Sequence, residues 1–292
     1  MKNVLRKIEK IISPPPYHWV GDGFKVHTFF PSIEIEKSRM SPFFLLDYNA
    51  KTKFPPSDNS RGVGSHPHRG FETVTIDYHG KVAHHDSAGN SGVIHEGDVQ
   101  WMTTGSGILH KEYHEKSFCK VGGIFQMVQL WVNLPAKYKM SEPKYQALVH
   151  DKMGKVKLPN NSGIVNIIAG EYQKVKGPAK TFTPVNLFDI RLNKNADVSF
   201  ELPENYNSAI LIIDGTATIN DSDTAQTDQF VLFGNSGTTV KISATEDSVI
   251  LLLSGEPLNE PIFQHGPFLM NTKKEIIEAF DDFNNGKFGY LE

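Results

Sequence analysis

Short runs of β-forming residues alternate with turn residues along most of the chain. Clusters of Gly, Pro, Asn and Asp recur roughly every 8 to 12 residues, the spacing typical of antiparallel sandwiches and barrels. The runs between them include 71–78 (FETVTIDY) and 128–132 (VQLWV). No helical segments alternate with these runs, so the pattern predicts an all-β protein and argues against a βαβ arrangement.

A helical pattern appears near the C-terminal end. Thr272 and Glu275 have the spacing of a capping box, which marks a helix start. The apolar residues that follow at the spacing of one helix face are Ile276, Ile277, Phe280 and Phe283. We expect one short amphipathic helix that packs on the second half of the chain.

The β pattern breaks near the middle of the chain, at Pro135 and the Lys-rich stretch 136–143. We place a linker there, which gives a domain of residues 1–135 and a domain of residues 136–292 that includes the C-terminal helix. The 292 residues suffice for two domains. A weak internal repeat agrees with two copies of one architecture, because 75–83 and 211–219 both have the pattern strand, glycine turn, strand.

Composition narrows the class of protein. The 30 Lys and Arg residues against 33 Asp and Glu give a net charge of -3, without the basic excess of a dedicated nucleic-acid-binding domain. The N-terminus mixes charges where a signal peptide needs an apolar stretch, and no apolar run reaches the roughly 18 residues of a membrane span. We therefore expect a cytoplasmic protein with no direct nucleic-acid or membrane partner.

The single cysteine, Cys119, cannot form an intramolecular disulfide, a zinc ribbon or an iron–sulfur cluster. We expect it to pack as a small apolar residue. Any metal ion in this protein therefore needs histidine and carboxylate ligands.

Histidine is concentrated in the first half, where ten of twelve lie at or before position 114. His66 and His68 are two residues apart, so they share one face of an extended segment, and His110 and Glu112 repeat this spacing. Two strands that each contribute such a pair to one barrel interior supply four converging ligands. The second half has no such pair, so we expect one metal ion per chain.

Three neutral imidazoles and one carboxylate around a divalent ion leave a net charge near +1 and two open positions in an octahedron. Open adjacent positions allow a substrate and dioxygen to bind together, as in other non-haem iron sites. Zinc also accepts these ligands. The arrangement indicates a catalytic metal.

Glu72 is a rival carboxylate. It lies on the face of His66 and His68 by parity, but four residues at about 3.3 Å each put it about 13 Å beyond His68 in a straight strand. It could reach the ion only if the strand bends at Arg69–Gly70.

A second rival is a cluster around a predicted hairpin, made of His79, His84, His85 and Asp86. The neighbours His84 and His85 point to opposite faces of a strand, so we interpret the cluster as a solvated hairpin and not as a second metal site. The glycine run at 105–107 lacks the third glycine and the βαβ context of a dinucleotide-binding loop.

Several motifs make the chain similar to a known family. They are 66–75 (HPHRGFETVT), 86–92 (DSAGNSG), 97–103 (GDVQWMT), 107–110 (GILH), 129–134 (QLWVNL) and 264–272 (QHGPFLMNT). Together they resemble the pirin family of the cupin superfamily, over a stretch from about Pro42 to Phe288. The resemblance implies a bicupin of two antiparallel β-barrel (jelly-roll) domains, with metal only in the N-terminal one.

The resemblance also implies a site. The metal of pirins is usually iron, and the residues that match its ligands are His66, His68, His110 and Glu112. Fe(II) is therefore the expected ion, although Mn, Ni, Cu, Co and Zn suit the same ligands. Glu72 becomes a structural carboxylate. Pirins are similar to quercetin 2,3-dioxygenases at this site and several bacterial members have that activity, whereas animal members are described as nuclear, iron-dependent transcription cofactors.

Two hypotheses follow. The first is a dioxygenase that cleaves flavonols with dioxygen and releases carbon monoxide, in which Glu112 takes the proton of the 3-hydroxyl as general base. The residues expected to grip a flat aromatic substrate are Phe71, Met102, Phe125 and Met127. The second is an iron-binding redox or metal-sensing regulator that acts through a protein partner and has incidental quercetinase activity.

The chain departs from the family pattern directly after the ligands, where Lys111 and the run Tyr113–His114–Glu115–Lys116 replace smaller residues. We expect these side chains to narrow or recharge the mouth of the pocket.

Overall fold

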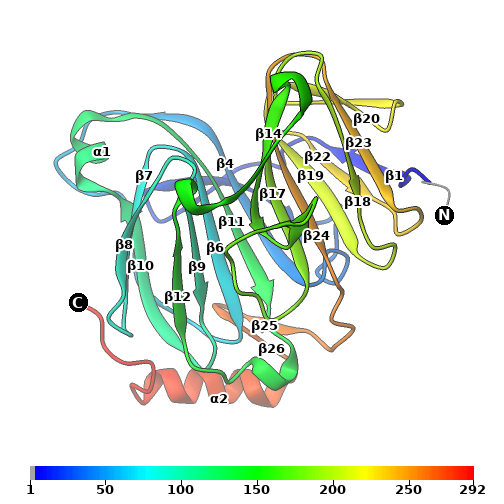
Figure 1. Cartoon of the computed structure of the whole chain (residues 1–292). Helices are drawn as coiled ribbons and strands as arrows, with labels where there is room; N and C mark the ends of the chain where they lie inside the picture. Colours follow the sequence, from blue (N-terminus) through cyan, green and yellow to red (C-terminus); the bar gives the residue numbers. More distant parts are fainter. Residues whose placement is uncertain (1–3) are drawn as a thin grey trace. The chain divides into compact units, whose positions relative to one another are not determined.

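The structure is a computed structural model that describes residues 4–292, and strands dominate it (Figure 1). The chain forms two compact units. The first barrel comprises 16–38, 42–150 and 258–292, and the second barrel comprises the described residues up to Pro15 together with 39–41 and 151–257. All named strands pair antiparallel, so the predicted all-β fold of two barrels is confirmed.

The first barrel has a seven-stranded sheet of order β12–β9–β6–β11–β4–β3–β2 and a four-stranded sheet of order β5–β10–β7–β8. Its strands are β2 (His18–Val20), β3 (Phe24–Phe30), β4 (Phe43–Phe54), β5 (Gly62–His68), β6 (Phe71–His79), β7 (Lys81–Asp86), β8 (Ser91–His95), β9 (Val99–Thr103), β10 (Ile108–His114), β11 (Gly123–Asn133) and β12 (Lys144–Leu148). A ribbon of β25 (Phe263–His265) and β26 (Phe268–Met270), the short helix α1 (Lys116–Val121), the 3-10 turn η1 (Ala136–Tyr138) and helix α2 (Lys273–Asn284) complete it.

The second barrel repeats this plan, with sheets of order β1–β22–β19–β24–β17–β14–β13 and β18–β23–β20–β21. Its strands are β1 (Ile8–Ile12), β13 (Gly154–Lys157), β14 (Gly163–Ala169), β15 (Glu171–Tyr172), β16 (Val175–Lys176), β17 (Val185–Leu192), β18 (Asp197–Glu201), β19 (Asn207–Asp214), β20 (Thr216–Ile219), β21 (Asp223–Gln226), β22 (Phe230–Phe233), β23 (Thr239–Ala244) and β24 (Ser248–Gly255). Two 3-10 turns, η2 (His150–Lys152) and η3 (Pro159–Asn161), lie near its start. Its interior is one apolar cluster drawn from both sheets.

The repeat seen in the sequence corresponds to equivalent hairpins. Strands β6 and β7 join at Gly80, and β19 and β20 join at Gly215. Both glycines have positive φ, 106° and 85°, a conformation that costs glycine little because it has no Cβ.

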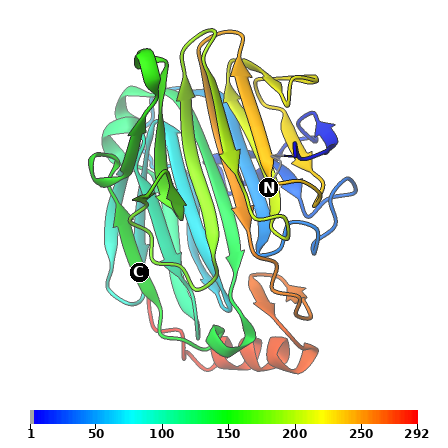
Figure 2. The same ribbon diagram turned by 45° about the vertical axis from the view of Figure 1, so that its right-hand side comes forward.

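The C-terminal helix forms where its cap predicts. The hydroxyl of Thr272 accepts a hydrogen bond from the backbone N–H of Glu275 and donates to the Glu275 carboxylate. The helix packs beside the β25–β26 ribbon, as Figure 2 shows in orange and red, and Arg69 pairs with Asp282 at 2.8 Å. These strands lie in the second half of the chain, as expected, but they and the helix belong to the first barrel and not to the second.

The stretch 136–143, where we expected a linker, lies inside the first barrel. Lys139 is buried there, and its ammonium donates to the carbonyls of Gly70 and Leu269 and to the side chain of Asn133. The two compact units therefore do not correspond to a division of the chain at residue 135. The described residues up to Pro15 belong to the second barrel, and residues 258–292 belong to the first. Within residues 4–292, no helix has the length and apolar character needed to cross a membrane.

Candidate metal centre

Strands β5 and β10 bring the four predicted ligands to the interior of the first barrel. They pair antiparallel with His66 opposite His110. Alternate residues of β10 are buried, so His110 and Glu112 face inward, with 1% and 5% of their surface exposed. Period-2 alternation in a half-buried strand accounts for this placement.

The three imidazoles face one another. Ring centroids are 4.3 Å apart between His66 and His110, and 4.8 Å apart between His68 and each of the other two. One nitrogen from each ring forms a group whose members all lie within 4.8 Å of one another. Three nitrogens converging at this range suit a transition-metal ion.

Hydrogen bonds set the tautomers of two of these rings. Nδ1 of His66 lies 2.8 Å from the carbonyl of Gly64, and Nδ1 of His68 lies 3.2 Å from the carbonyl of Pro267. A carbonyl only accepts, so each Nδ1 carries the proton and each Nε2 keeps its lone pair for a metal. His110 is buried and neither of its nitrogens has a hydrogen-bond partner. The donor set therefore fits a divalent metal, and without one it leaves buried polar atoms unsatisfied.

The electrostatics favour neutral rings. Burial, followed by the charge of His66, lowers the pKa of His68 and of His110 well below the usual value of histidine. Only a neutral imidazole has a lone pair to bind a metal, so the barrel interior keeps both rings ready for one.

Glu112 is held by three neutral donors. Oε1 accepts hydrogen bonds from the hydroxyl of Thr75 at 3.0 Å and the amide of Gln100 at 2.9 Å. Oε2 accepts one from the amide of Gln129 at 2.8 Å. Three donors hold the carboxylate in one orientation, as a ligand or a base requires. The structure groups Glu112 with His110 and with His84, which the sequence had not suggested.

Glu72 lies elsewhere. Its carboxylate accepts a hydrogen bond from the hydroxyl of Thr103 at 2.8 Å, and it is absent from the candidate metal groups of the described residues. Burial raises its pKa to about 7. On β6, Glu72 lies between Phe71 and Thr73, so its side chain points to the face of the strand opposite to theirs. This placement agrees with a structural role.

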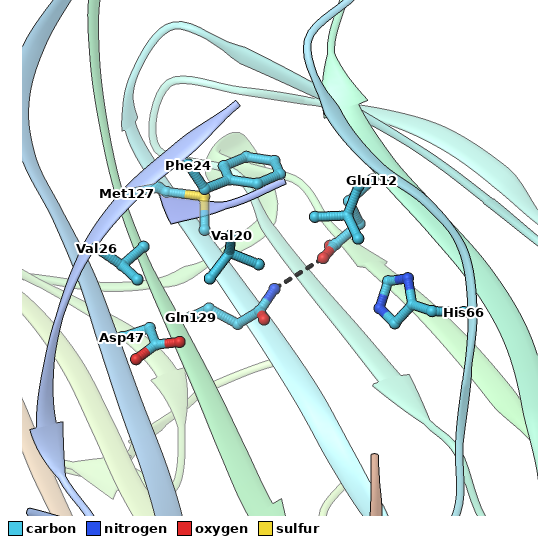
Figure 3. Close-up of a pocket in the computed structure, with 9 residues that line it drawn as sticks. Val20, Phe24, Val26, Asp47, His66, Glu112, Met127 and Gln129 are labelled. Carbon is cyan, nitrogen blue, oxygen red and sulfur yellow. Dashed lines mark hydrogen bonds between the residues drawn. The ribbon is translucent and has the colours of Figure 1, made fainter. Parts of the chain in front are cut away.

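A pocket opens beside His66 and Glu112 (Figure 3). Its volume is about 30 Å³, room for roughly two water molecules. Its lining residues are Val20, Phe24, Val26, Asp47, Val63, His66, Glu112, Met127 and Gln129. Asp47, whose carboxylate accepts a hydrogen bond from Thr28 and whose pKa is raised by burial, is a polar member that the sequence had not suggested.

Of the four residues expected to grip a substrate, Met127 lines this pocket. Phe71 packs between His68 and Trp131, at ring distances of 5.1 Å and 4.1 Å, and so supports a ligand from behind. Phe125 belongs to an apolar cluster, and Met102 is fully buried on β9. These three are core residues.

The prediction of a solvated hairpin is right for His79 and wrong for His84 and Asp86. The side chain of His79 is 40% exposed, whereas His84 is fully buried. Strand β7 pairs with β10 and places His84 opposite Glu112. His85 points away and stacks on Tyr113.

The residues that depart from the family pattern do not line the pocket. Lys111 donates to the backbone carbonyl of Glu292 at 2.5 Å, and Tyr113 contacts His85. His114 is buried among phenylalanine rings, and the Glu115 side chain caps α1, which begins at Lys116. The expected narrowing of the mouth is therefore not seen. Cys119 is buried and packs as predicted, with Sγ 3.4 Å from the carbonyl of His114.

The sequence also missed the donors to Glu112, although strand parity could have revealed them. Thr75 shares a face with Phe71, Gln100 with Met102, and Gln129 with Met127. Each polar partner therefore lies on the same face of its strand as a residue that we had expected to contact the substrate.

Comparisons with known proteins agree with the fold. Two family models match, Pirin over residues 23–132 and the Pirin C-terminal cupin domain over 187–289. A Pseudomonas aeruginosa protein named "Putative quercetin 2,3-dioxygenase PA2418" is 45% identical over 97% of this chain and 99% of its own. Human Pirin is 38% identical over 87% of this chain and 85% of its own.

Solved structures give the same picture. A quercetin 2,3-dioxygenase from Acinetobacter baumannii has a TM-score of 0.93 and 45% identity, and the match covers 99% of this chain and 100% of that one. The Escherichia coli pirin YhhW, solved in complex with nickel(II), has 19% identity and a TM-score of 0.63 over 85% of this chain and 99% of its own, and shares the fold.

Proposed function

Since the chain belongs to the pirin family, we propose that it is a metal-dependent dioxygenase that cleaves flavonols, of the quercetin 2,3-dioxygenase type. Relatives with that name, one of them 45% identical along nearly the whole chain, support the proposal. The observation that carries it is the convergence of three imidazoles, of which that of His66 lines a small pocket that also holds the fixed carboxylate of Glu112.

His66, His68, His110 and Glu112 would hold one divalent transition metal per chain, with Fe(II) the expected ion. When bound, this metal supplies Lewis acidity and open positions where a hydroxyl group and a neighbouring carbonyl of the substrate can chelate. The remaining steps fall to the side chains of the barrel.

Glu112 takes the proton of the substrate's 3-hydroxyl. Its Oε2 accepts a hydrogen bond from Gln129 and has one lone pair left to serve the metal and then the proton, whereas Oε1 already accepts two hydrogen bonds. Gln129 also lines the pocket (Figure 3), so it fixes the base at the place where the hydroxyl arrives. A positioned base of this kind contributes roughly 10²- to 10⁴-fold to rate.

The size of the pocket sets a condition on this function. Room for water-sized groups admits the chelating edge of a flavonol but not its ring system. Val20 and Phe24 form part of the wall and belong to the β2–β3 hairpin, so this hairpin has to move outward when an aromatic substrate binds.

The same small pocket favours a second candidate, an iron-binding or metal-sensing regulator that acts through a protein partner. A sensor needs a buried ion but no substrate channel. Human Pirin is a relative of similar length, and members of this family include regulators.

Aerobic turnover of the metal-loaded protein against a panel of flavonols tests the proposal. We expect one dioxygen consumed per quercetin, bleaching of its near-ultraviolet band and release of carbon monoxide, with flavones that lack the 3-hydroxyl inert. Elemental analysis establishes the metal load beforehand.

Bleaching no faster than that by free metal in buffer would reject the enzyme and favour the regulator. Equal turnover by His110→Ala would also reject it, because the chemistry would then lie outside this site.

A further inference from the structure

His84 is a buried histidine beside the metal centre to which no role is yet assigned. It lies on β7, is fully buried, and stacks on the ring of Tyr145 with centroids 5.1 Å apart. Its ring centroid is 5.5 Å from that of His110, and its backbone pairs with Glu112. A histidine in such a place needs partners for both ring nitrogens, or a ligand.

Asp86 fixes the tautomer of His84. Nε2 of His84 lies 3.2 Å from Oδ2 of Asp86. The other oxygen of Asp86 accepts hydrogen bonds from the backbone N–H groups of Ala88 and Asn90, at 2.9 Å each, and the Asn90 amide also donates to both oxygens.

The Asp86 oxygens accept from all their other partners, so the contact at 3.2 Å assigns the proton to Nε2 of His84 and leaves Nδ1 its lone pair. Nδ1 is buried and has no hydrogen-bond partner. A histidine that donates one N–H to a carboxylate and leaves its other nitrogen free has the arrangement of metal-binding histidines in proteins.

His84 belongs to a second group of candidate donors. One ligand atom from each of His84, His110 and Glu112 lies within 4.8 Å of the other two, the same range as in the group of His66, His68 and His110. All three residues are buried. The two groups share His110, so an ion displaced from one group meets the other.

We propose that His84 is a metal donor of this protein, and that His84, His110 and Glu112 form a second position for a divalent transition metal. The two positions share His110 and are occupied one at a time, so the content stays at one ion per chain. The inference rests on the metal centre of the proposed function, but it concerns binding of the ion and not turnover.

Removing two ligands of the first position tests whether the second position binds a metal ion. The full chain with His66→Ala and His68→Ala should still bind about one Co(II) per chain, measured by competition with a chromophoric chelator. Adding His84→Gln should weaken that binding tenfold or more, the scale expected for loss of a supporting metal interaction. The visible spectrum of bound Co(II) should change as well, because it reports the donors around the ion.

His85→Gln in the same double variant is the matched control. His85 is the adjacent histidine on β7, but its ring stacks on Tyr113 and is not part of either donor group. Its loss should leave Co(II) affinity unchanged. Equal affinity of the double variant and its His84→Gln derivative would overturn the proposal, as would equal weakening by His84→Gln and His85→Gln.

Far-ultraviolet circular dichroism shows whether the double variant folds. If it does not, His84→Gln alone is compared with His85→Gln alone in the otherwise natural chain, where an unchanged Co(II) spectrum and affinity would equally overturn the proposal. Quercetin turnover by the natural chain is measured separately. A chain that binds metal through His84 but leaves quercetin intact would refute the proposed function and not this inference.

Discussion

The two barrels have equivalent strand orders, but the first has polar residues at interior positions where the second has apolar ones. Each has a seven-stranded and a four-stranded antiparallel sheet, and the hairpins at Gly80 and Gly215 mark equivalent points in them. Counting from these glycines and following the pairing registers gives equivalent positions. The pairs are His66 and Phe200, His84 and Ile219, His110 and Val240, and Glu112 and Ile242.

The replacement of polar by apolar residues also occurs at the positions of the hydrogen-bond donors to Glu112. The equivalents of Thr75, Gln100 and Gln129 in the second barrel are Ile210, Val231 and Leu252. Every one of these equivalents belongs to the apolar cluster of the second barrel. One backbone therefore accommodates a polar, metal-ready interior or a purely apolar one.

The difference shows where residues needed for function lower the stability of the fold. Buried polar groups destabilise a fold unless they have partners, and the first barrel leaves nitrogens of His84 and His110 without any. The second barrel has apolar contacts at the same points, which stabilise it without a ligand. We infer that the second barrel supports the fold and the first carries the chemistry.

The largest effect should come from substitutions at the shared position of His110 and Val240. His110→Ala removes a donor common to both groups, so metal content and quercetin turnover should fall more than about 100-fold, beyond the effect of losing a supporting residue. Val240→Ala should leave turnover per bound metal unchanged. Elemental analysis and the bleaching assay measure both, and a similar loss in the two variants would contradict the division of roles.

The next effect distinguishes two buried carboxylates of the first barrel. Glu112→Gln should weaken metal binding and lower turnover roughly 100-fold or more beyond the loss of metal, because the base is gone. Glu72→Gln should keep most of the metal, since Glu72 is hydrogen-bonded to Thr103 away from the histidines. The reverse ranking in metal content would show that Glu72 is the ligand.

A third effect concerns stability alone. Ile242 occupies the position of Glu112 in the second barrel and is fully buried. Ile242→Ala should lower the free energy of unfolding by about 2–5 kcal/mol, through lost burial and a cavity. Denaturant unfolding measures this loss, and metal content should stay the same. A drop in metal per folded chain would mean that the second barrel supports the site directly.

The sequence predicted the ligand pairs because alternation along a strand is local. His110 and Glu112 face inward since every second residue of β10 does. The burial of His84 was not predictable in this way, because it depends on the pairing of β7 with β10, some 28 residues apart at His84 and Glu112. Residue spacing within one hairpin cannot show which of its faces a distant strand will cover.

The C-terminal helix shows the same limit. Its cap and periodicity gave its existence and its start at Thr272. Its contact with the first barrel includes the pair Arg69 and Asp282, which lie 213 residues apart. Helical periodicity identifies the apolar face of a helix but not the surface that covers it.

The smallest effect is a pH dependence that the second barrel lacks at the same position. His114 lies among the rings of Phe24, Phe54, Phe118 and Phe125, where the apolar equivalent is Ala244. Burial lowers its pKa to about 4, and the charged groups that act on it are Arg61, which lowers the pKa, and Asp22, which raises it.

The sign of the effect follows from proton binding. Below an ordinary histidine pKa of about 6.5 the unfolded chain takes up a proton at this residue, whereas the folded chain does not until about pH 4. The contribution of neutral His114 is therefore complete above pH 6.5 and is lost as the pH falls to about 4, at up to about 1.4 kcal/mol per pH unit. Urea unfolding of metal-free protein between pH 4 and 8 should show a steeper loss for the natural chain than for His114→Phe. Parallel curves would mean that His114 takes up a proton as readily in the folded protein as in the unfolded chain. The interior of the first barrel would then be more open to water than that of the second barrel.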